Sequence, residues 1–386
     1  MPDAHSRYSP SSAHRWLNCS ASMAFEDALE GEEQTSPYAA EGTAAHALAE
    51  RVLRTGIKSC KGLLGEEIAP GHVVDHEMAH YVQIYVDDIR RQGGELFVEA
   101  EVRYDQWVPT GWGTSDAGII IPSRKLAIIN DLKYGRGVRV DAEDNVQMKL
   151  YALGFYQDYG FLYDIEVFEL IIHQPRLDHR STWSIALPEL LTFAEEAKAA
   201  AQAIETGERR FNPGEKTCQW CPGKPTCKAY ANFIASQIGA EFDYDTGEIR
   251  TVDVGSLSPE ELGRIYGSLD HAAHWIQSVK AHVDSLLGSN VAVPGWKRVK
   301  GGRRTRFWKD ETAAENTLKS MRLKQEDMYT QGLRSPAQLE KVLTPRRWKR
   351  LQNLVGWSEG KPTVVPESDP RPAINTDLDA DFDYAD

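Results

Sequence analysis

The chain has 386 residues, of which 41% are hydrophobic and 26% are charged, and its formal net charge is −13. Because single domains usually contain about 100 to 200 residues, a chain of this length has room for a full core and a second module. No apolar run approaches the roughly 20 residues of a membrane helix, and the opening residues lack the apolar stretch of a secretory signal. We therefore expect no membrane segment and a reducing, cytoplasmic compartment in which disulfides are rare.

The negative net charge hides an uneven distribution of charge along the chain. From Trp296 to Arg350 there are 16 Lys and Arg against 6 Asp and Glu, whereas from Pro366 to the end seven acidic residues face Arg371 alone. A basic footprint is typical of nucleic-acid binding, and an acidic, proline-containing end is typical of disorder. The sequence thus predicts three parts, which are a first domain at 1–239, a mostly helical basic region at 240–365 and a disordered acidic tail at 366–386.

Two interpretations of the basic region remain open. Its Gly- and Arg-rich stretch, residues 295–308, predicts a basic loop or hairpin. The region is either a DNA track with aromatic side chains available for base stacking or a solvated helical surface. The aromatic candidates are Trp296, Phe307, Trp308 and Trp348.

Hydrophobic periodicity predicts the secondary structure of the first domain. Two helices are followed by three strands, the last two joined by a turn, which suggests an antiparallel meander. A helix, two strands and an alanine-rich helix complete the series. The expected ranges, in chain order, are 42–53, 75–91, 96–104, 112–121, 125–133, 143–159, 165–173, 182–187 and 188–206. The expected fold class is mixed α/β, with a core of helix, three-stranded meander, helix and strand.

A carboxylate and an ammonium share the end of the third predicted strand. Asp131 and Lys133 lie two residues apart, so alternation along a strand places their side chains on one face. Asp116 lies on the strand expected to pair with this one. Two such carboxylates can hold Mg²⁺, which prefers oxygen ligands and activates water beside a phosphate. An isolated D-x-K triplet, however, is more often a surface ion pair.

Three further polar residues lie on the helices that flank these strands. His46 is on the preceding helix and offers a nitrogen ligand compatible with Mn²⁺ as well as Mg²⁺. Gln147 and Tyr151 are four residues apart on the following helix, so both face one side, from which they can contact a phosphate or a base. Taken singly, the histidine is more often an ordinary helix residue, and the pair is more often a product of amphipathic chance.

Together and in this order, these residues resemble the motifs of the RecB-like branch of the PD-(D/E)XK nucleases. That family has a histidine in a G-T-x-x-H helix, an aspartate in a G-x-x-D strand, a D-x-K strand end and a Q-x-x-x-Y helix. The matching segments are Gly42-Thr43-Ala44-Ala45-His46, Gly113-Thr114-Ser115-Asp116, Asp131-Leu132-Lys133 and Gln147-Met148-Lys149-Leu150-Tyr151. The similarity extends over about Ser9 to Tyr230 and includes the order of the predicted elements.

The resemblance implies a divalent-metal site with assigned roles. His46, Asp116 and Asp131 would bind Mg²⁺ or Mn²⁺ together with the carbonyl oxygen of Leu132. Lys133 would assist the chemistry beside the attacking water.

The resemblance also implies supporting residues around that site. Gln147 and Tyr151 would contact DNA, and Glu99 or Glu101 of the first strand would support the metal through water. Alternation places both glutamates on one face, so the sequence does not choose between them.

Three of the five cysteines are clustered in one loop. Cys218, Cys221 and Cys227 form C-x2-C-x5-C, with a glycine and two prolines between them. Three thiolates need a fourth ligand, and both tetrahedral zinc and a four-iron cluster accept such a set. The spacing alone leaves both open and leans toward zinc.

The RecB-like family includes members with an iron-sulfur cluster whose first cysteine precedes the histidine helix and whose other three follow the nuclease core. Cys19 occupies the first of these positions, so the resemblance implies a 4Fe-4S cluster on Cys19 and the three clustered cysteines. The family's proline after the first cysteine is Ser20 here, a departure that removes no ligand. Cys60 fits no part of the arrangement and is expected to be a buried thiol.

The resemblance implies a metal-dependent deoxyribonuclease, an exonuclease that hydrolyses phosphodiester bonds in phage recombination or repair inside a bacterial host. Two other classes of function remain. One is a non-catalytic DNA-binding module that keeps the fold and the cluster as a scaffold. The other is a zinc-stabilised protein that assembles on a phage recombinase or a single-strand-binding protein. The complete set of His46, Asp116, Asp131 and Lys133 favours the nuclease.

Overall fold

The computed structural model describes residues 6–28, 37–237, 240–242, 249–251, 257–301, 306–329, 333–357 and 360–374. The chain divides into two compact units, Met1–His271 and Ala272–Asp386. The boundary between the units lies about 30 residues after the predicted one at 239–240. Helix α9 (Pro259–Gly288) begins in the first unit and ends in the second. In the described part of the chain, no helix is long and apolar enough to cross a membrane.

The first unit is built on a five-stranded mixed sheet with the strand order β3-β4-β5-β6-β7. Its strands are β3 (Glu95–Arg103), β4 (Trp112–Ile121), β5 (Leu126–Leu132), β6 (Val167–Gln174) and β7 (His179–Ala186). All neighbours are antiparallel except β5 and β6, which are parallel. The predicted antiparallel meander and the mixed α/β fold class are both confirmed.

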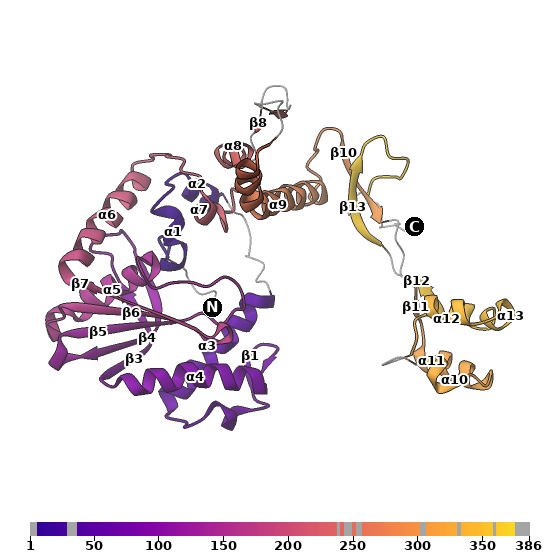
Figure 1. Ribbon diagram of the computed structural model, residues 1–386, viewed down its shortest axis with the longest axis horizontal. Coiled ribbons are helices and arrows are strands. Elements are labelled where there is room, and N and C mark those ends of the chain that lie inside the picture. Colours follow the sequence, from indigo (N-terminus) through magenta and orange to yellow (C-terminus); the bar gives the residue numbers. More distant parts are fainter. Residues whose placement is uncertain are drawn as a thin grey trace, which may run out of the picture. The chain divides into compact units, whose positions relative to one another are not determined.

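Helices cover both faces of this sheet (Figure 1). The parallel pair β5 and β6 needs a crossover, which α5 (Val146–Tyr163) provides on the same face as α6 (Leu187–Glu205). The opposite face carries α3 (Pro37–Thr55) and α4 (His76–Gln92), which form a second buried cluster with apolar side chains of the sheet. The sheet is therefore buried on both sides by hydrophobic contacts.

Local sequence signals explain where the two central helices begin. Asp75 precedes α4 and its side chain accepts a hydrogen bond from the Met78 N–H at 2.7 Å. Asn145 precedes α5 and accepts from the Met148 N–H at 3.2 Å. Both are N-cap residues that satisfy a free amide of the first turn.

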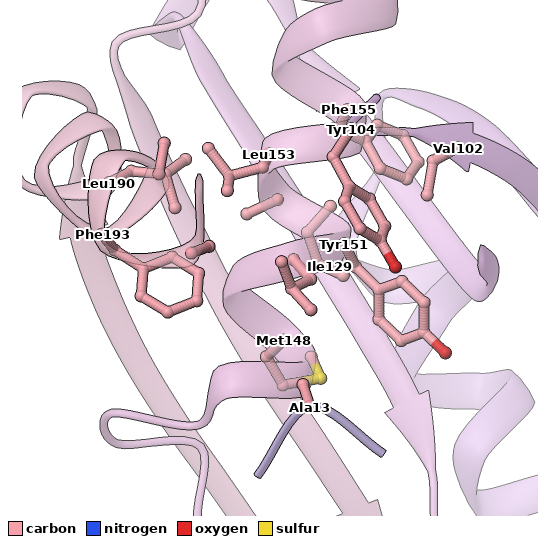
Figure 2. Close-up of a cluster of buried hydrophobic side chains, with 14 of the residues drawn as sticks. Ala13, Val102, Tyr104, Ile129, Met148, Tyr151, Leu153, Phe155, Leu190 and Phe193 are labelled. Carbon is pink, nitrogen blue, oxygen red and sulfur yellow. The ribbon is translucent and has the colours of Figure 1, made fainter. Parts of the chain in front are cut away.

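Helix α5 lies unusually close to the sheet. A methyl group added to Gly118 would meet the ring of Phe155 at 1.9 Å, so only glycine allows this approach. Phe155 belongs to the buried cluster of Figure 2, together with Met148, Leu153 and Tyr151 of the same helix. The close approach brings the start of α5 beside the end of β5.

The amino-terminal segment is part of the same core. It contains η1 (Pro10–Ser12), α1 (Ala13–Trp16) and α2 (Ser22–Asp27). Tyr8 and Trp16 are almost fully buried, and the Tyr104 hydroxyl donates to the Tyr8 carbonyl at 2.7 Å.

The remaining elements of the first unit are short. They are η2 (Cys60–Leu63), β1 (Glu67–Ala69), β2 (His72–Val73), η3 (Pro122–Arg124), η4 (Pro175–Leu177), α7 (Glu215–Cys218), α8 (Lys228–Gln237), β8 (Ala240–Phe242) and β9 (Ile249–Thr251).

The second unit contains strands as well as the expected helices. Strands β10 (Trp296–Gly301) and β13 (Gly360–Pro366) pair with each other, and so do β11 (Arg306–Trp308) and β12 (Val355–Trp357). The Gly- and Arg-rich stretch is therefore not a hairpin, because its two strands pair with later parts of the chain. The other elements are α10 (Glu311–Ser320), α11 (Gln325–Met328), α12 (Pro336–Val342), α13 (Pro345–Trp348) and η5 (Gln352–Leu354).

Two expectations for this unit need correction. Trp308 and Trp348 are each only 8% exposed in a hydrophobic cluster of the second unit, so they are not available for base stacking, whereas Trp296 and Phe307 are about half exposed. The second correction concerns the tail, which was predicted to be disordered from Pro366 but whose first part contacts a strand. The Ile374 N–H donates to the Arg298 carbonyl at 2.8 Å, because residues 366–374 lie along β10. The rest of the predicted tail, 375–386, lies outside the described residues.

Candidate functional site

Three carboxylates lie in one row across the sheet. The register of β3 with β4 places Glu99 across from Asp116. The pairing of β4 with β5 places Asp116 beside Asp131 where that pairing ends. Because residues that are opposite on neighbouring strands are about 5 Å apart, the row concentrates negative charge at one point.

His46 of α3 reaches this row from the helix. Its Nδ1 atom lies 3.2 Å from Asp116 Oδ1, and ligand atoms of His46, Glu99 and Asp116 all lie within 4.8 Å of one another. The other oxygen of Asp116 accepts the Leu132 N–H at 2.7 Å. Leu132 thus contacts the site through its N–H, and the role expected of its carbonyl oxygen stays a prediction.

The D-x-K pair has the geometry that alternation predicts. The Lys133 ammonium donates to Asp131 Oδ1 at 3.1 Å and lies 3.0 Å from Oδ2. Asp131 is only 2% exposed, and its Oδ2 atom makes no hydrogen bond in spite of that short contact. The Lys133 ammonium compensates the charge of this buried oxygen, whose remaining lone pairs suit a bound cation.

Gln147 and Tyr151 meet the D-x-K pair from α5. Lys133 Nζ donates to Gln147 Oε1 at 3.1 Å, and Gln147 Nε2 donates to Asp131 Oδ1 at 3.3 Å. The same nitrogen also contacts the Tyr151 hydroxyl at 3.2 Å. The ring of Tyr151 is buried in the hydrophobic cluster (Figure 2), so only its polar end faces the site.

The ionisation of these groups reflects a strongly negative potential. Burial and the charge of Asp116 raise the pKa of Glu99 to about 7. Burial and the charge of Asp116 also raise the pKa of Asp131, although Lys133 opposes this. Burial alone would lower the pKa of His46, but Asp116, Asp131 and Glu99 outweigh it and raise the pKa to about 9. A divalent cation would relieve the repulsion that these shifts report.

The same balance keeps Lys133 positively charged. Burial would lower its pKa, but the Asp131 and Asp116 carboxylates outweigh burial and raise it. Asp116 shows the opposite balance, because His46, the Leu132 N–H and Lys133 lower its pKa against the effect of burial. The site therefore contains an ionised Asp116 carboxylate and a positively charged Lys133 ammonium.

The donor set fits a hard divalent cation. One imidazole and two carboxylates, those of His46, Glu99 and Asp116, converge within 4.8 Å of one another, and the buried Asp131 lies next to them. Carboxylate oxygens suit Mg²⁺ and Mn²⁺, and imidazole suits the latter. His46 and Asp116 would hold the ion with Glu99, and Asp131 lies beside them.

The structure distinguishes the two candidate glutamates. Glu99 belongs to the convergent group and has a φ of +46°, a left-handed conformation that interrupts the regular strand. Glu101 is exposed and pairs with Arg103 at 3.2 Å. Strained backbone of this kind is concentrated at functional sites.

Buried polar residues behind the site were not anticipated. Asn130 is fully buried and exchanges hydrogen bonds with Gln92 at 2.9 and 3.0 Å. Its Oδ1 atom also lies 3.0 Å from His173 Nε2. The backbone carbonyl of His173 accepts the Lys133 N–H at 2.8 Å. The signal in the sequence was a polar residue near the end of each of two strands, directly after a pair of isoleucines.

The four cysteines expected to act together line one pocket. Cys19, Cys218, Cys221 and Cys227 all contribute to its wall, and the empty space at the pocket, part of which is open solvent, is about 340 Å³. Burial raises the pKa of the Cys218 thiol to about 11, with smaller contributions from the other three. Among the described residues, no three of these sulfur atoms are all within 4.8 Å of one another. Cys60 lies apart from them, fully buried in the α3–α4 cluster.

Contacts near this pocket join the amino-terminal segment to the cysteine loop and to the residues just before that loop. The Arg210 N–H donates to Ser20 Oγ at 2.8 Å, which ties the amino-terminal segment to the chain just before the cysteine loop. A methyl group on Gly223 would meet the Phe25 ring at 2.3 Å. Arg15 donates to the Trp220 carbonyl at 3.2 Å.

Two comparisons with known proteins gave matches to this chain. A solved structure titled "Crystal structure of SSO0001" is 16% identical, covers 53% of this chain and 92% of its own, and has a TM-score of 0.24. The family described as protein of unknown function (DUF2800) matches residues 5–372. The chain therefore belongs to the DUF2800 family.

Proposed function

We propose that this protein is a divalent-metal-dependent deoxyribonuclease with an exonuclease activity that serves phage recombination or repair in the bacterial cytoplasm. The observation that supports it best is the convergence of His46, Glu99 and Asp116 beside the buried pair of Asp131 and Lys133. A charged lysine at the edge of a metal site suits a phosphodiesterase, because negative charge develops on the phosphate in the transition state.

The residues of the site have different roles in the proposed reaction. When bound, Mg²⁺ or Mn²⁺ would supply a lowered pKa for an attacking water and a positive charge beside the phosphate. His46, Asp116 and Glu99 would hold the cation, and Asp131 beside them would supply a further carboxylate oxygen. Lys133 donates hydrogen bonds toward the water or the phosphate from a position that Asp131 and Gln147 fix.

DNA contacts at this site involve α5. Gln147 is only partly buried and already orients Lys133, whereas the Tyr151 ring is buried and offers its hydroxyl alone. We expect Gln147 to position the lysine and a backbone phosphate together. Tyr151 supports Gln147 from behind.

Cleavage of end-labelled single-stranded and duplex DNA, with and without Mg²⁺ or Mn²⁺, tests the proposal. Metal-dependent shortening from one end of the strand is the expected result, and a covalently closed circle should resist. DNA binding without cleavage under all metal conditions would contradict the nuclease proposal and favour a non-catalytic DNA-binding scaffold.

We also propose a 4Fe-4S cluster on Cys19, Cys218, Cys221 and Cys227. Tetrahedral zinc, with Zn–S bonds of about 2.3 Å, needs sulfur atoms roughly 3.8 Å apart. The sulfur atoms of these cysteines are spread more widely around their common pocket, which suits the larger cluster. Thiol pKa values raised by burial mean that loading must displace protons.

Anaerobically purified protein should contain iron and acid-labile sulfide. Cys19→Ser should lose both and should lower the melting temperature, because the cluster joins the amino-terminal segment to the loop after the core. Cys60→Ser is the matched control, and it should keep the wild-type iron and sulfide content. Stoichiometric zinc without sulfide in the wild-type protein would rule out the cluster.

Glu99 rather than Glu101 should bind the divalent metal. Glu99→Gln should weaken Mn²⁺ binding by about tenfold or more, since even residues that only orient a metal ligand contribute about 10- to 100-fold. Glu101→Gln removes the same charge from the same strand and should leave the affinity unchanged. Isothermal titration calorimetry with Mn²⁺ distinguishes the two, and equal losses would mean that only the general charge of the strand matters.

A further inference from the structure

A short basic segment of the second unit has an orientation that its sequence alone does not give. Helix α13 and the two residues after it contain four cations in five positions, and all four are exposed. We call them the α13 basic face, which consists of Arg346, Arg347, Lys349 and Arg350. Trp348, in the middle of the five, is only 8% exposed.

The helical geometry places the cations together. Successive helical residues are separated by about 100° of rotation, so the four cations occupy one side of the turn and Trp348 points to the other. The helical hydrogen bond from the Lys349 N–H to the Pro345 carbonyl, at 3.0 Å, extends the turn past the end of α13. Leu351 is fully buried on the same side as Trp348.

The buried side is held firmly in place. The Trp348 ring meets Trp308 edge-on at 6.3 Å, and the Arg306 guanidinium lies 5.7 Å from its centre. Trp308 in turn donates its indole N–H to the Arg334 carbonyl at 2.9 Å. These contacts fix which way the α13 basic face points.

Three carboxylates of this unit pair with cations outside the α13 basic face. Glu340 pairs with Arg306, Glu315 with Lys319, and Glu326 with Lys324 at 3.4 Å. Among the ion pairs of the described residues, none includes a member of the α13 basic face. Its one side-chain hydrogen bond in that part of the chain joins Arg350 to the Ser320 hydroxyl at 3.2 Å.

We propose that the α13 basic face binds the phosphate backbone of DNA without regard to base sequence, at a site separate from the metal centre. Four adjacent cations that have no carboxylate partner within the described ranges match a polymer that carries one charge per phosphate. Arginine and lysine contacts to phosphates supply affinity and release counterions, but they read no bases. The proposal extends the proposed DNA substrate to a second surface of the chain.

The salt dependence of binding provides the test. Each phosphate contact adds about 0.9 to the slope of log K against log salt on duplex DNA. With the full-length protein in EDTA and a fluorescein-labelled duplex, R346Q/R347Q should therefore reduce the slope by about 1.8. R346K/R347K, which keeps both charges, should restore it.

The matched control is K319Q/K324Q, which removes the same charge from the same unit but from lysines already paired with carboxylates. It should leave the slope close to that of the wild type. An unchanged slope in R346Q/R347Q, or an equal loss in the control, would overturn the proposal. Because binding is measured without divalent metal, an absence of cleavage would count against the nuclease and not against this surface.

Discussion

Asp116→Ala should abolish divalent-metal binding and DNA cleavage together. Asp116 lies between Glu99 and Asp131 in the row of carboxylates and contacts His46 at 3.2 Å. Its loss removes an oxygen ligand and also frees the imidazole that it orients. Because residues that only orient a ligand contribute about 10- to 100-fold in affinity, loss of this ligand should weaken Mn²⁺ binding by more than about 100-fold.

Calorimetric titration with Mn²⁺ and the cleavage assay should be run on the same preparation of Asp116→Ala. The iron and sulfide content is the control for folding, since the cysteine pocket is formed by other parts of the chain. Asp131→Ala should also lose metal and cleavage, and it leaves Lys133 without its carboxylate partner. Wild-type Mn²⁺ affinity in Asp116→Ala would show that the ion, if any, binds elsewhere.

Lys133→Ala should lose most turnover while it keeps the metal. Its ammonium is charged because Asp131 and Asp116 outweigh the effect of burial on its pKa. Removing that charge makes the carboxylate row more negative, so Mn²⁺ should bind at least as tightly as before. The rate of single-turnover cleavage should fall by at least about 100-fold, the usual effect of removing one donor from a developing oxyanion.

DNA affinity should change little in Lys133→Ala, because one ammonium is a small part of a phosphate-binding surface. Lys125→Ala is the matched control. Lys125 lies just before the other end of β5 and pairs with Asp164 and Glu166, so its removal should leave cleavage at the wild-type rate. If Lys133→Ala cleaves DNA as fast as the wild type with its cluster intact, the catalytic assignment is wrong.

Periodicity in the sequence predicted the local structure of the first unit closely. The strand expected at 112–121 is β4 (Trp112–Ile121), and the helix expected at 75–91 is α4 (His76–Gln92). Alternation also placed Asp131 and Lys133 on one face, where the structure shows them in contact. These features depend on residues only a few positions apart, whose geometry is set by the strand or helix itself.

Long-range pairing limited what the sequence could predict in the second unit. The basic stretch alone was compatible with a hairpin, but β10 pairs with β13 and β11 with β12, which begin about 50 residues later. Residues 367–374, whose composition is typical of a disordered tail, also contact β10 and Gly295 just before it, through hydrogen bonds and a bridge outside that pairing. Composition describes a segment by itself and does not describe the strand against which it lies.

The sequence by itself determined which residue types gather at the candidate site, because the motifs of His46, Asp116, Asp131 and Lys133 occur in a fixed order. Only the tertiary structure decided between Glu99 and Glu101. Strict alternation gives both the same face, but the left-handed φ of Glu99 and its position across from Asp116 bring that residue alone into the group. The choice depends on a local distortion and on a partner strand, and neither is written in the spacing of residues along one strand.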